Sequence, residues 1–233
     1  MIATTTTVRY WTLAWLAAAA IAGASSAHAS VIAEWTFETS QPLLNNSATI
    51  TGILPEVGVG IASGVHASSA TDYSNPTGNG SNESFNSNNW APDDYYQFSV
   101  STLGLANITF AWDQTTSASG SSQRFKIQAD FGSGLTDILN PYFVRDDVWN
   151  STTPDPDSIF GPISLGAAAA DQSTILVRIT GIFTGSPPPP PSGTSSVRVD
   201  NVTISGDPVV PEPATWLTVG GCLLLGWAVS SRR

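Results

Sequence analysis

Hydrophobic and polar residues alternate with a period of two in much of the chain between residues 30 and 207. The clearest stretch is Arg124-Phe125-Lys126-Ile127-Gln128-Ala129, where every second side chain is apolar. This period is typical of a β-strand with one buried face. Helical periodicity is nearly absent from the same region, so the pattern predicts an all-β domain.

Several other segments are rich in β-branched and aromatic residues and are bounded by Gly, Pro, Asn and Ser clusters. They predict strands at residues 31–38, 95–100, 107–112, 159–165, 175–183 and 197–204, and weaker ones at 57–61 and 142–144. Residues 68–89 are predicted to be a loop, and the five prolines at 187–191 an extended left-handed segment. Eight or nine strands indicate a β-sandwich, and a jelly roll is the arrangement we expect.

The N-terminus has the order of a secretory signal. Arg9 is followed by an apolar run at residues 12–24 and by Ala27-His28-Ala29, an A-x-A cleavage site. The run is shorter than the roughly 18 apolar residues of a spanning helix. We expect residues 1–29 to be a signal peptide cleaved after Ala29; an N-terminal membrane anchor is the alternative.

The C-terminus carries a second hydrophobic segment. Residues 214–231 contain no charge and are followed by Arg232 and Arg233. A helix of this length spans about 27 Å, close to the roughly 30 Å of a bilayer core. By the positive-inside rule, Arg232 and Arg233 are a cytoplasmic anchor. The domain would then lie on the far side of the membrane, as a signal peptide also predicts.

Val210-Pro211-Glu212-Pro213-Ala214 stands directly before this helix. The order of Pro-Glu-Pro, spanning helix and terminal arginines resembles the PEP-CTERM sorting signal of Gram-negative bacteria. The resemblance implies that residues 208–233 are a sorting tail recognised by an exosortase through Pro211, Glu212 and Pro213, in proteins associated with exopolysaccharide. An ordinary tail anchor is the alternative.

Composition narrows the function of the domain at residues 30–207. From residue 30 to 213 there are five basic and eighteen acidic residues, a net charge of −13. This argues against nucleic acid as a partner, because nucleic-acid binding needs a basic surface. Cys222 is the only cysteine and lies in the tail, and His66 is the only histidine after the signal. Disulfides, thiolate metal sites and His-rich zinc sites are therefore excluded.

Three short motifs resemble jelly-roll carbohydrate-binding domains and other PEP-CTERM proteins: the segments at residues 33–38, 94–98 and 197–202. In that fold class the first and last strands adjoin, and carboxylates from both can hold a structural calcium ion. The resemblance points to Glu34 or Glu38 and to Asp200 as ligands, and calcium prefers six to eight oxygen ligands. In the alternative interpretation, Asp200 and Asn201 cap a turn. Arg198 is a rival partner for Asp200.

The catalytic signals are weak. The acidic pairs at residues 93–94, 146–147 and 155–157 are typical of solvated loops, and His66 has no neighbour that marks a triad. Five aromatic residues could stack on sugars or fill the core: Trp90, Tyr95, Tyr96, Trp112 and Trp149. We expect no enzyme, but an exported surface or matrix protein, sorted by its tail and associated with exopolysaccharide or biofilm. The alternatives are a carbohydrate-binding module acting alone and a secreted hydrolase with a carboxylate site.

Overall fold

The computed structural model describes residues 29–117, 123–182 and 195–209. Ala29–Pro208 form one compact unit. The predicted signal peptide and the predicted sorting tail lie almost wholly outside the described residues. Among the residues that are described, no helix is long and apolar enough to cross a membrane.

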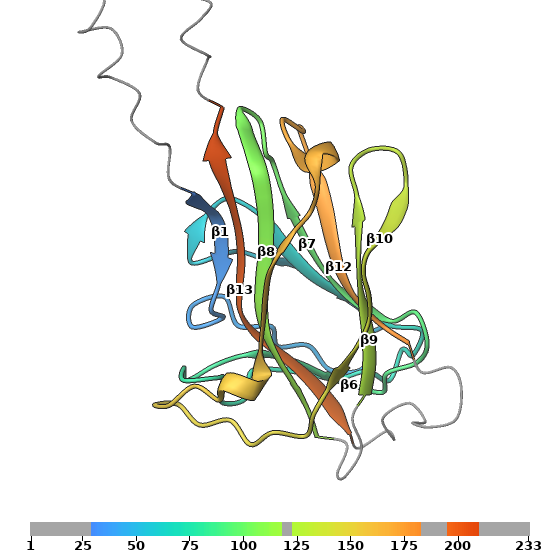
Figure 1. The fold of residues 1–233 in the computed structure, drawn as a ribbon. Helices are drawn as coiled ribbons and strands as arrows, with labels where there is room; N and C mark the ends of the chain where they lie inside the picture. The colour runs from blue at the N-terminus through green and yellow to red at the C-terminus, as the bar shows by residue number, and fades with distance from the viewer. Residues whose placement is uncertain (1–28, 118–122, 183–194, 210–233) are drawn as a thin grey trace, which may run out of the picture. The chain divides into compact units, whose positions relative to one another are not determined.

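The unit Ala29–Pro208 is all-β and contains two sheets (Figure 1). Sheet A has the order β11-β8-β13-β1-β3, and β6 also pairs with β13 and β5 with β6. Its strands are β1 (Ser30–Trp35), β3 (Val57–Gly58), β5 (Tyr73–Ser74), β6 (Phe85–Asn88), β8 (Leu105–Thr116), β11 (Ile159–Ser164) and β13 (Ser196–Pro208).

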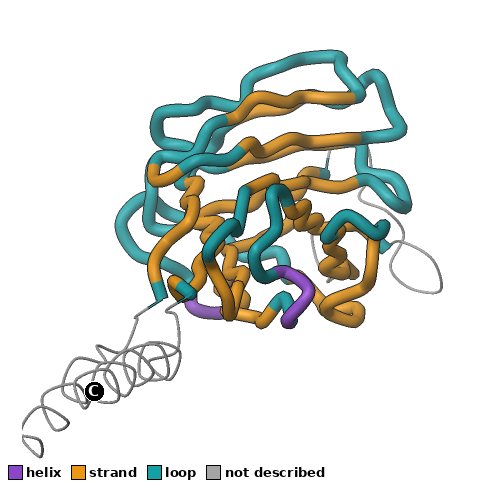
Figure 2. The backbone as a smooth tube through the Cα atoms, turned by 90° about the horizontal axis from the view of Figure 1, so that it is seen from above, coloured by secondary structure: helices purple, strands orange, loops and turns teal. Residues whose placement is uncertain are grey.

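Sheet B has the order β10-β9-β12-β7-β4-β2, and all its pairs are antiparallel. Its strands are β2 (Thr49–Ile53), β4 (Ile61–Val65), β7 (Tyr95–Val100), β9 (Gln123–Asp130), β10 (Leu135–Val144) and β12 (Ile175–Gly181). Helical structure in the described part is limited to two short 3₁₀ turns, η1 (Pro156–Ser158) and η2 (Ala167–Ala169), drawn in purple in Figure 2.

Aromatic side chains from both sheets meet in one core. Trp35 of sheet A contacts Phe98 of sheet B edge-on, with ring centroids 5.1 Å apart. The ring centroids of Phe85 in sheet A and Tyr96 in sheet B lie 4.3 Å apart. All four side chains are almost completely buried. Face-to-face packing of two antiparallel sheets through such side chains defines a β-sandwich, and the predicted sandwich is confirmed.

The first and last strands adjoin, as expected. Strand β13 pairs with β6 over its first residues and with β1 over its later ones, while β8 lies on its other side. The register shifts between Asp200 and Thr203, where Asn201 has φ of 47°. Asparagine tolerates this left-handed conformation better than most residues. The bulge lets β13 change partners without ending the strand.

The predicted loop at residues 68–89 was wrong in part, because it contains β5 and β6. Strand β2 was also missed, and β10 begins at Leu135 rather than near residue 142. Thirteen strands occur in the described part, against eight or nine expected. The missed strands are short or carry Ser and Asn, residues with little intrinsic preference for strands. The formation of these strands therefore depends on tertiary contacts.

Candidate functional site

The outer face of sheet B carries an ordered set of polar side chains. On β7, β9 and β12, every second side chain enters the core, including Tyr96, Ile127 and Val177. The side chains between them point to the opposite face because the strand period is two. These outward residues are mostly polar and half-buried: Tyr95, Gln97, Arg124, Lys126, Gln128 and Arg178.

The strand register lines up one polar row across this face. Arg178 of β12 pairs with Gln97 of β7 on one side and with Gln128 of β9 on the other. Gln97 pairs in turn with Ser63 of β4, and Gln128 with Asp137 of β10. We call these five residues, Asp137, Gln128, Arg178, Gln97 and Ser63, the polar row.

Hydrogen bonds hold the side chains of the polar row in place. Nε of Arg178 donates to Oε1 of Gln97 at 2.8 Å, and Nε2 of Gln128 donates to Oδ1 of Asp137 at 2.8 Å. The hydroxyls of Ser63 and Thr51 lie 2.8 Å apart. Hydrogen bonds between neighbouring side chains restrict their rotamers before a ligand binds. Binding then loses less side-chain entropy.

Tyr95 lies beside the polar row. The guanidinium of Arg178 stands 3.9 Å from the centroid of its ring, a close cation–π contact. On β10, Phe143 is 60% exposed, and Arg124 lies 5.7 Å from its ring centroid. Strands β10 and β7 are three positions apart in sheet B, which places them about 14 Å from each other at the usual strand spacing.

Three of the five basic residues of the domain, Arg124, Lys126 and Arg178, lie on this face. The carboxylate of Asp137 partly offsets the positive charge of these three residues. Its pKa is lowered, first by the hydrogen bond from Gln128 and less by Lys126, whose Nζ is 3.2 Å from Oδ1. The face is therefore close to neutral or weakly positive on a domain that is strongly acidic.

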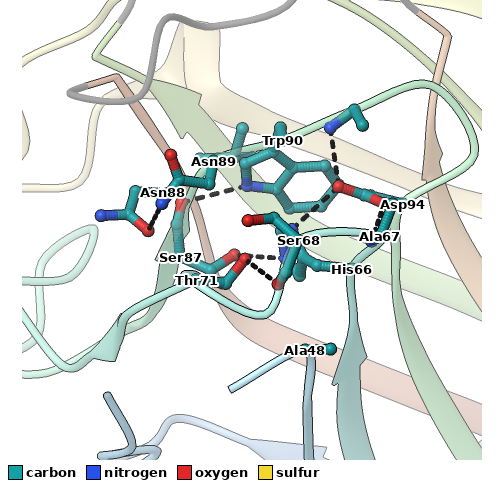
Figure 3. A network of polar contacts seen from close by, with 12 residues as sticks. Ala48, His66, Ala67, Ser68, Thr71, Ser87, Asn88, Asn89, Trp90 and Asp94 are labelled. Carbon is teal, nitrogen blue, oxygen red and sulfur yellow. Dashed lines mark hydrogen bonds and ion pairs between the residues drawn. The ribbon is translucent and has the colours of Figure 1, made fainter. Parts of the chain in front are cut away.

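A second cluster has the composition of a catalytic triad (Figure 3). Nδ1 of His66 lies 3.0 Å from Oδ2 of Asp94, and Nε2 of the same ring lies 3.0 Å from the Ser87 hydroxyl. Sequence analysis did not find these partners, because they come from segments 21 and 28 residues away. Their order is that of an Asp-His-Ser relay.

Burial argues against catalysis at this cluster. Ser87 is completely buried, His66 is 4% exposed and Asp94 is 3% exposed. The Ser87 hydroxyl also lies 2.6 Å from the Tyr96 hydroxyl, which donates to the Val197 carbonyl at 2.8 Å. Burial raises the pKa of Tyr96 well above its ordinary value. The chain of bonds runs from sheet B to β6 and β13 of sheet A, so it connects the two layers.

The indole of Trp90 closes this cluster, as Figure 3 shows. Its ring lies 4.6 Å from the His66 ring in an edge-on arrangement, and its Nε1 donates to the Ser87 carbonyl at 3.0 Å. Asp94 is fixed by the backbone N–H groups of Ala67 and Ala91, at 2.7 and 2.6 Å. A substrate carbonyl has no path to Ser87 in this arrangement.

Two of the three predicted calcium ligands, Glu38 and Asp200, lie around one loop, residues 78–83. Oδ2 of Asp200 accepts hydrogen bonds from the Asn79 backbone N–H at 2.8 Å and from the Ser81 hydroxyl at 2.5 Å. Oε1 of Glu38 accepts from the backbone N–H groups of Asn82 and Glu83 at 2.6 and 2.8 Å. Glu38 and Asp200 thus hold the two ends of the same loop.

Burial raises the pKa of Asp200 to about 7, and repulsion from Asp113, its partner across the ladder, adds a smaller contribution. The Asp113 pKa is also raised by burial, although Asn79 and Asn201 each donate to its Oδ2. Asp200 forms no ion pair with Arg198, whose Nη1 donates to the Thr77 carbonyl instead.

These carboxylates do not form a ready metal site as they stand. Glu34 pairs with Thr203, beyond the bulge, rather than with Asp200. Within the described residues, no three His, Cys, Asp or Glu side chains are grouped so that they could hold a metal ion. Donors from the loop already satisfy Asp200, so calcium stays a prediction.

The other predicted site residues lie at the two ends of the chain or are aromatic side chains of the domain. Ala29 is exposed and directly precedes β1. The sorting motif Pro211, Glu212 and Pro213 and the anchor Arg232 and Arg233 lie outside the described residues. Four of the five candidate aromatics are buried, with exposures of 5% or less: Trp90, Tyr96 and Trp112 in the core, and Trp149 in the loop after β10. Tyr95 alone among them belongs to the outer face.

Comparison with known proteins gives similarity only at the level of solved structures. No family model matches the chain, and no curated protein matches it. The chain is similar to the CBM22-2 xylan-binding domain of Paenibacillus barcinonensis Xyn10C, at 13% identity over 74% of this chain and 98% of that domain, with a TM-score of 0.43.

Two further structures extend this comparison. The chain spans about half of the CBM22-1–CBM22-2 tandem of the same protein, at 10% identity over 82% of this chain and 49% of the tandem, with a TM-score of 0.43. The K3 cleaved adhesin domain of Lys-gingipain from Porphyromonas gingivalis w83 matches at 12% identity over 75% of this chain and 98% of that domain, with a TM-score of 0.41. Similarity at this level carries no argument about function.

Proposed function

We propose that this chain is an exported, non-enzymatic protein that binds a polysaccharide on the outer face of sheet B. The observation that carries the proposal is the polar row, which crosses five strands beside Tyr95. This interpretation favours the carbohydrate-binding alternative from the sequence over a matrix protein without a glycan ligand.

The chemistry of this face suits a sugar chain. A pyranose ring has an apolar side that packs on an aromatic ring, and Tyr95 offers one whose position is fixed by Arg178. Vicinal hydroxyls both donate and accept hydrogen bonds, as do the amides of Gln97 and Gln128. These amides retain donor and acceptor capacity beyond the bonds they already form.

The shape of the site favours a long ligand. The polar row extends across the strands of an open sheet face, so a chain can lie along it and continue past both ends. Phe143 offers a second aromatic ring near the β10 end of the face. A nucleic acid would also be long, but a domain with five basic and seventeen acidic residues, a net charge of −12 over residues 30–207, repels its phosphates.

The sorting tail is a separate part of the proposal. Residues 208–233 would deliver the domain to the cell surface through an exosortase, with the membrane helix as a transient anchor. Support comes from the order of Pro211-Glu212-Pro213, uncharged segment and Arg232-Arg233. A jelly-roll arrangement of the sandwich is likewise proposed, and the pairing of β1 with β13 supports it.

A glycan array probed with the full chain tests the proposal, with Tyr95→Ala beside the wild type. We expect binding to at least one extended polysaccharide and a loss of tenfold or more in Tyr95→Ala, since stacking on one ring contributes about 1–3 kcal/mol to related aromatic recognition. Leu103→Ala is the control, because Leu103 is 61% exposed in the β7–β8 turn. No binding to any glycan, or equal binding by Tyr95→Ala, would contradict the proposal.

A further inference from the structure

The six strands of sheet B carry a different balance of charge from the rest of the domain. They contain three basic residues, Arg124, Lys126 and Arg178, and two acidic ones, Asp130 and Asp137. Residues 30–207 contain five basic and seventeen acidic residues, so the chain outside these strands contributes two and fifteen. Such a distribution gives the sheet a local potential that differs from that of the whole domain. Sheet B therefore carries a local excess of positive charge on an acidic domain.

Both carboxylates of sheet B already have partners. Oδ1 of Asp130 accepts hydrogen bonds from the backbone N–H groups of Gly132 and Gly134, at 2.8 and 2.9 Å. Oδ1 of Asp137 lies 3.2 Å from Nζ of Lys126. Neither carboxylate compensates the two arginines of the sheet.

Arg178 is fixed in position but keeps free donors. Its guanidinium carbon lies 3.9 Å from the centroid of the Tyr95 ring, and its Nε donates to Oε1 of Gln97 at 2.8 Å. Within the described residues, neither Arg178 nor Arg124 forms an ion pair, and Nη1 and Nη2 of Arg178 donate to no residue. Neither nitrogen is a buried atom that lacks a partner, so both reach solvent. A ligand on the outer face can therefore contact them.

A carboxylate matches these free donors. A guanidinium is planar, and its parallel N–H groups can bind both oxygens of a carboxylate at once. Because Tyr95 and Gln97 already hold the Arg178 side chain, binding loses little of its rotamer entropy. A neutral hydroxyl would accept from one N–H group and would leave the positive charge unmatched.

The acidity of the rest of the domain limits how densely such a ligand is charged. At physiological ionic strength, exposed charges are screened beyond about 8 Å, so a carboxylate on the face is governed mainly by the residues of that face. Nucleic acid carries one charge per about 1.7 Å of its axis and would also meet the carboxylates beyond the face. A polysaccharide with one carboxylate on a sugar unit avoids this repulsion.

We infer that the polysaccharide bound by the outer face of sheet B is acidic, with the carboxylate of a uronic acid on the guanidinium of Arg178. The inference rests on the proposed function, since it names the class of ligand for the same face. Arg124, which lies beside the exposed ring of Phe143, is a second cation for the same polymer.

Titration calorimetry of the full chain, purified in detergent, tests the inference with polygalacturonate, alginate and hyaluronate. Each polymer is compared with its own methyl ester, which keeps the sugar backbone and removes the charge. We expect at least one acid form to bind about tenfold or more tightly than its ester, since hydrogen bonds to charged groups are the stronger kind. Raising the ionic strength from about 0.01 M to about 1 M should abolish most of that preference, because the Debye length falls from about 30 Å to about 3 Å.

The acid-to-ester ratio of affinities separates recognition of the carboxylate from a structural role of Arg178. Arg178→Met removes the charge and keeps an apolar stem, so the ratio should fall to within about twofold of one. A merely structural role would weaken the acid and the ester equally and would leave the ratio unchanged. Arg145→Met, which removes the same charge from an exposed ion pair with Asp157, is the control and should keep the wild-type ratio within about twofold. If Arg178→Met does not fold, Arg124→Met replaces it and should lower the ratio about threefold or more.

The outcomes distinguish this inference from the proposed function. Equal binding of acid and ester by the wild type, or binding confined to neutral polymers such as xylan and dextran, would overturn the inference and leave the proposed function standing. Binding of dextran sulfate as tight as that of the acid form would overturn the assignment of a carboxylate. An unchanged ratio in the folded arginine variant would overturn the role of the arginine. Absence of binding to every acidic and neutral polysaccharide would overturn both proposals.

Discussion

Asp200 is the residue whose burial has the clearest consequence for stability. It is completely buried, and its pKa in the folded domain is about 7, against an ordinary value of 3.8. Between these two values the folded state holds a proton that the unfolded state has released. The free energy of unfolding should therefore fall as pH rises from about 4 to 7.

Chemical denaturation at pH 5 and pH 8, in EDTA, measures this effect. We expect the unfolding free energy of the wild type to be about 1–4 kcal/mol lower at pH 8 than at pH 5. The difference should be smaller in Asp200→Asn. Glu56 does not add to this effect. Burial raises its pKa, but hydrogen bonds from Thr36, Thr39 and Ser40 outweigh burial, so the net pKa is lowered and the carboxylate stays ionised over this range. Stability that rises with pH in the wild type would contradict the assignment.

Ser87 is the residue that joins the buried cluster together. Its hydroxyl is shared by His66 and Tyr96, so Ser87→Ala leaves two buried polar groups without that partner. We expect a loss of about 1–3 kcal/mol in unfolding free energy, measured by urea denaturation. Ser101→Ala, at an exposed serine after β7, is the control. A loss no larger than the control's would show that the cluster contributes nothing to joining the sheets.

At the scale of elements, the period-two pattern located β7, β9 and β12 closely, because their inner side chains are apolar and their outer ones polar, but it found only the end of β10. It did not find β6, whose inward Ser87 is buried through the hydroxyl contacts of His66 and Tyr96. Nor could it tell which of Tyr95 and Tyr96 faces the core. That choice depends on which face of sheet B meets sheet A, and only tertiary packing decides it.

The loop at residues 78–83 is the element on which the calcium prediction now depends. Its backbone and Ser81 donate to Glu38 and Asp200, and an ion would have to replace donors at these carboxylates. If calcium does so, thermal melting in calcium should exceed melting in EDTA. A hundredfold excess over the dissociation constant adds about 2.7 kcal/mol, or about 5–10 °C.

Asp200→Ala decides where such an ion lies. The calcium-dependent shift should disappear in this variant if Asp200 is a ligand, and magnesium should not replace calcium because it demands a smaller octahedral site. An identical melting temperature with calcium and with EDTA in the wild type would exclude a stabilising site. A shift that survives in Asp200→Ala would place the ion elsewhere.

At the scale of the whole molecule, the two ends predict export followed by processing. In a host with the matching exosortase, the wild type should be shortened at its C-terminus. The variant with alanine at Pro211, Glu212 and Pro213 should remain as a larger, membrane-bound species on an immunoblot. Identical processing of both proteins would contradict the sorting proposal, and N-terminal sequencing of the exported chain should begin at Ser30.

The central claim is that the outer face of sheet B binds a polysaccharide through a fixed row of side chains. Titration calorimetry of the best array ligand against Arg178→Ala and Arg145→Ala tests it most directly. Both variants remove an arginine, but Arg178 positions Tyr95 and Gln97, whereas Arg145 pairs with Asp157 at an exposed site. We predict about tenfold or greater weakening in Arg178→Ala and none in Arg145→Ala. Equal affinities of the two variants would contradict the account.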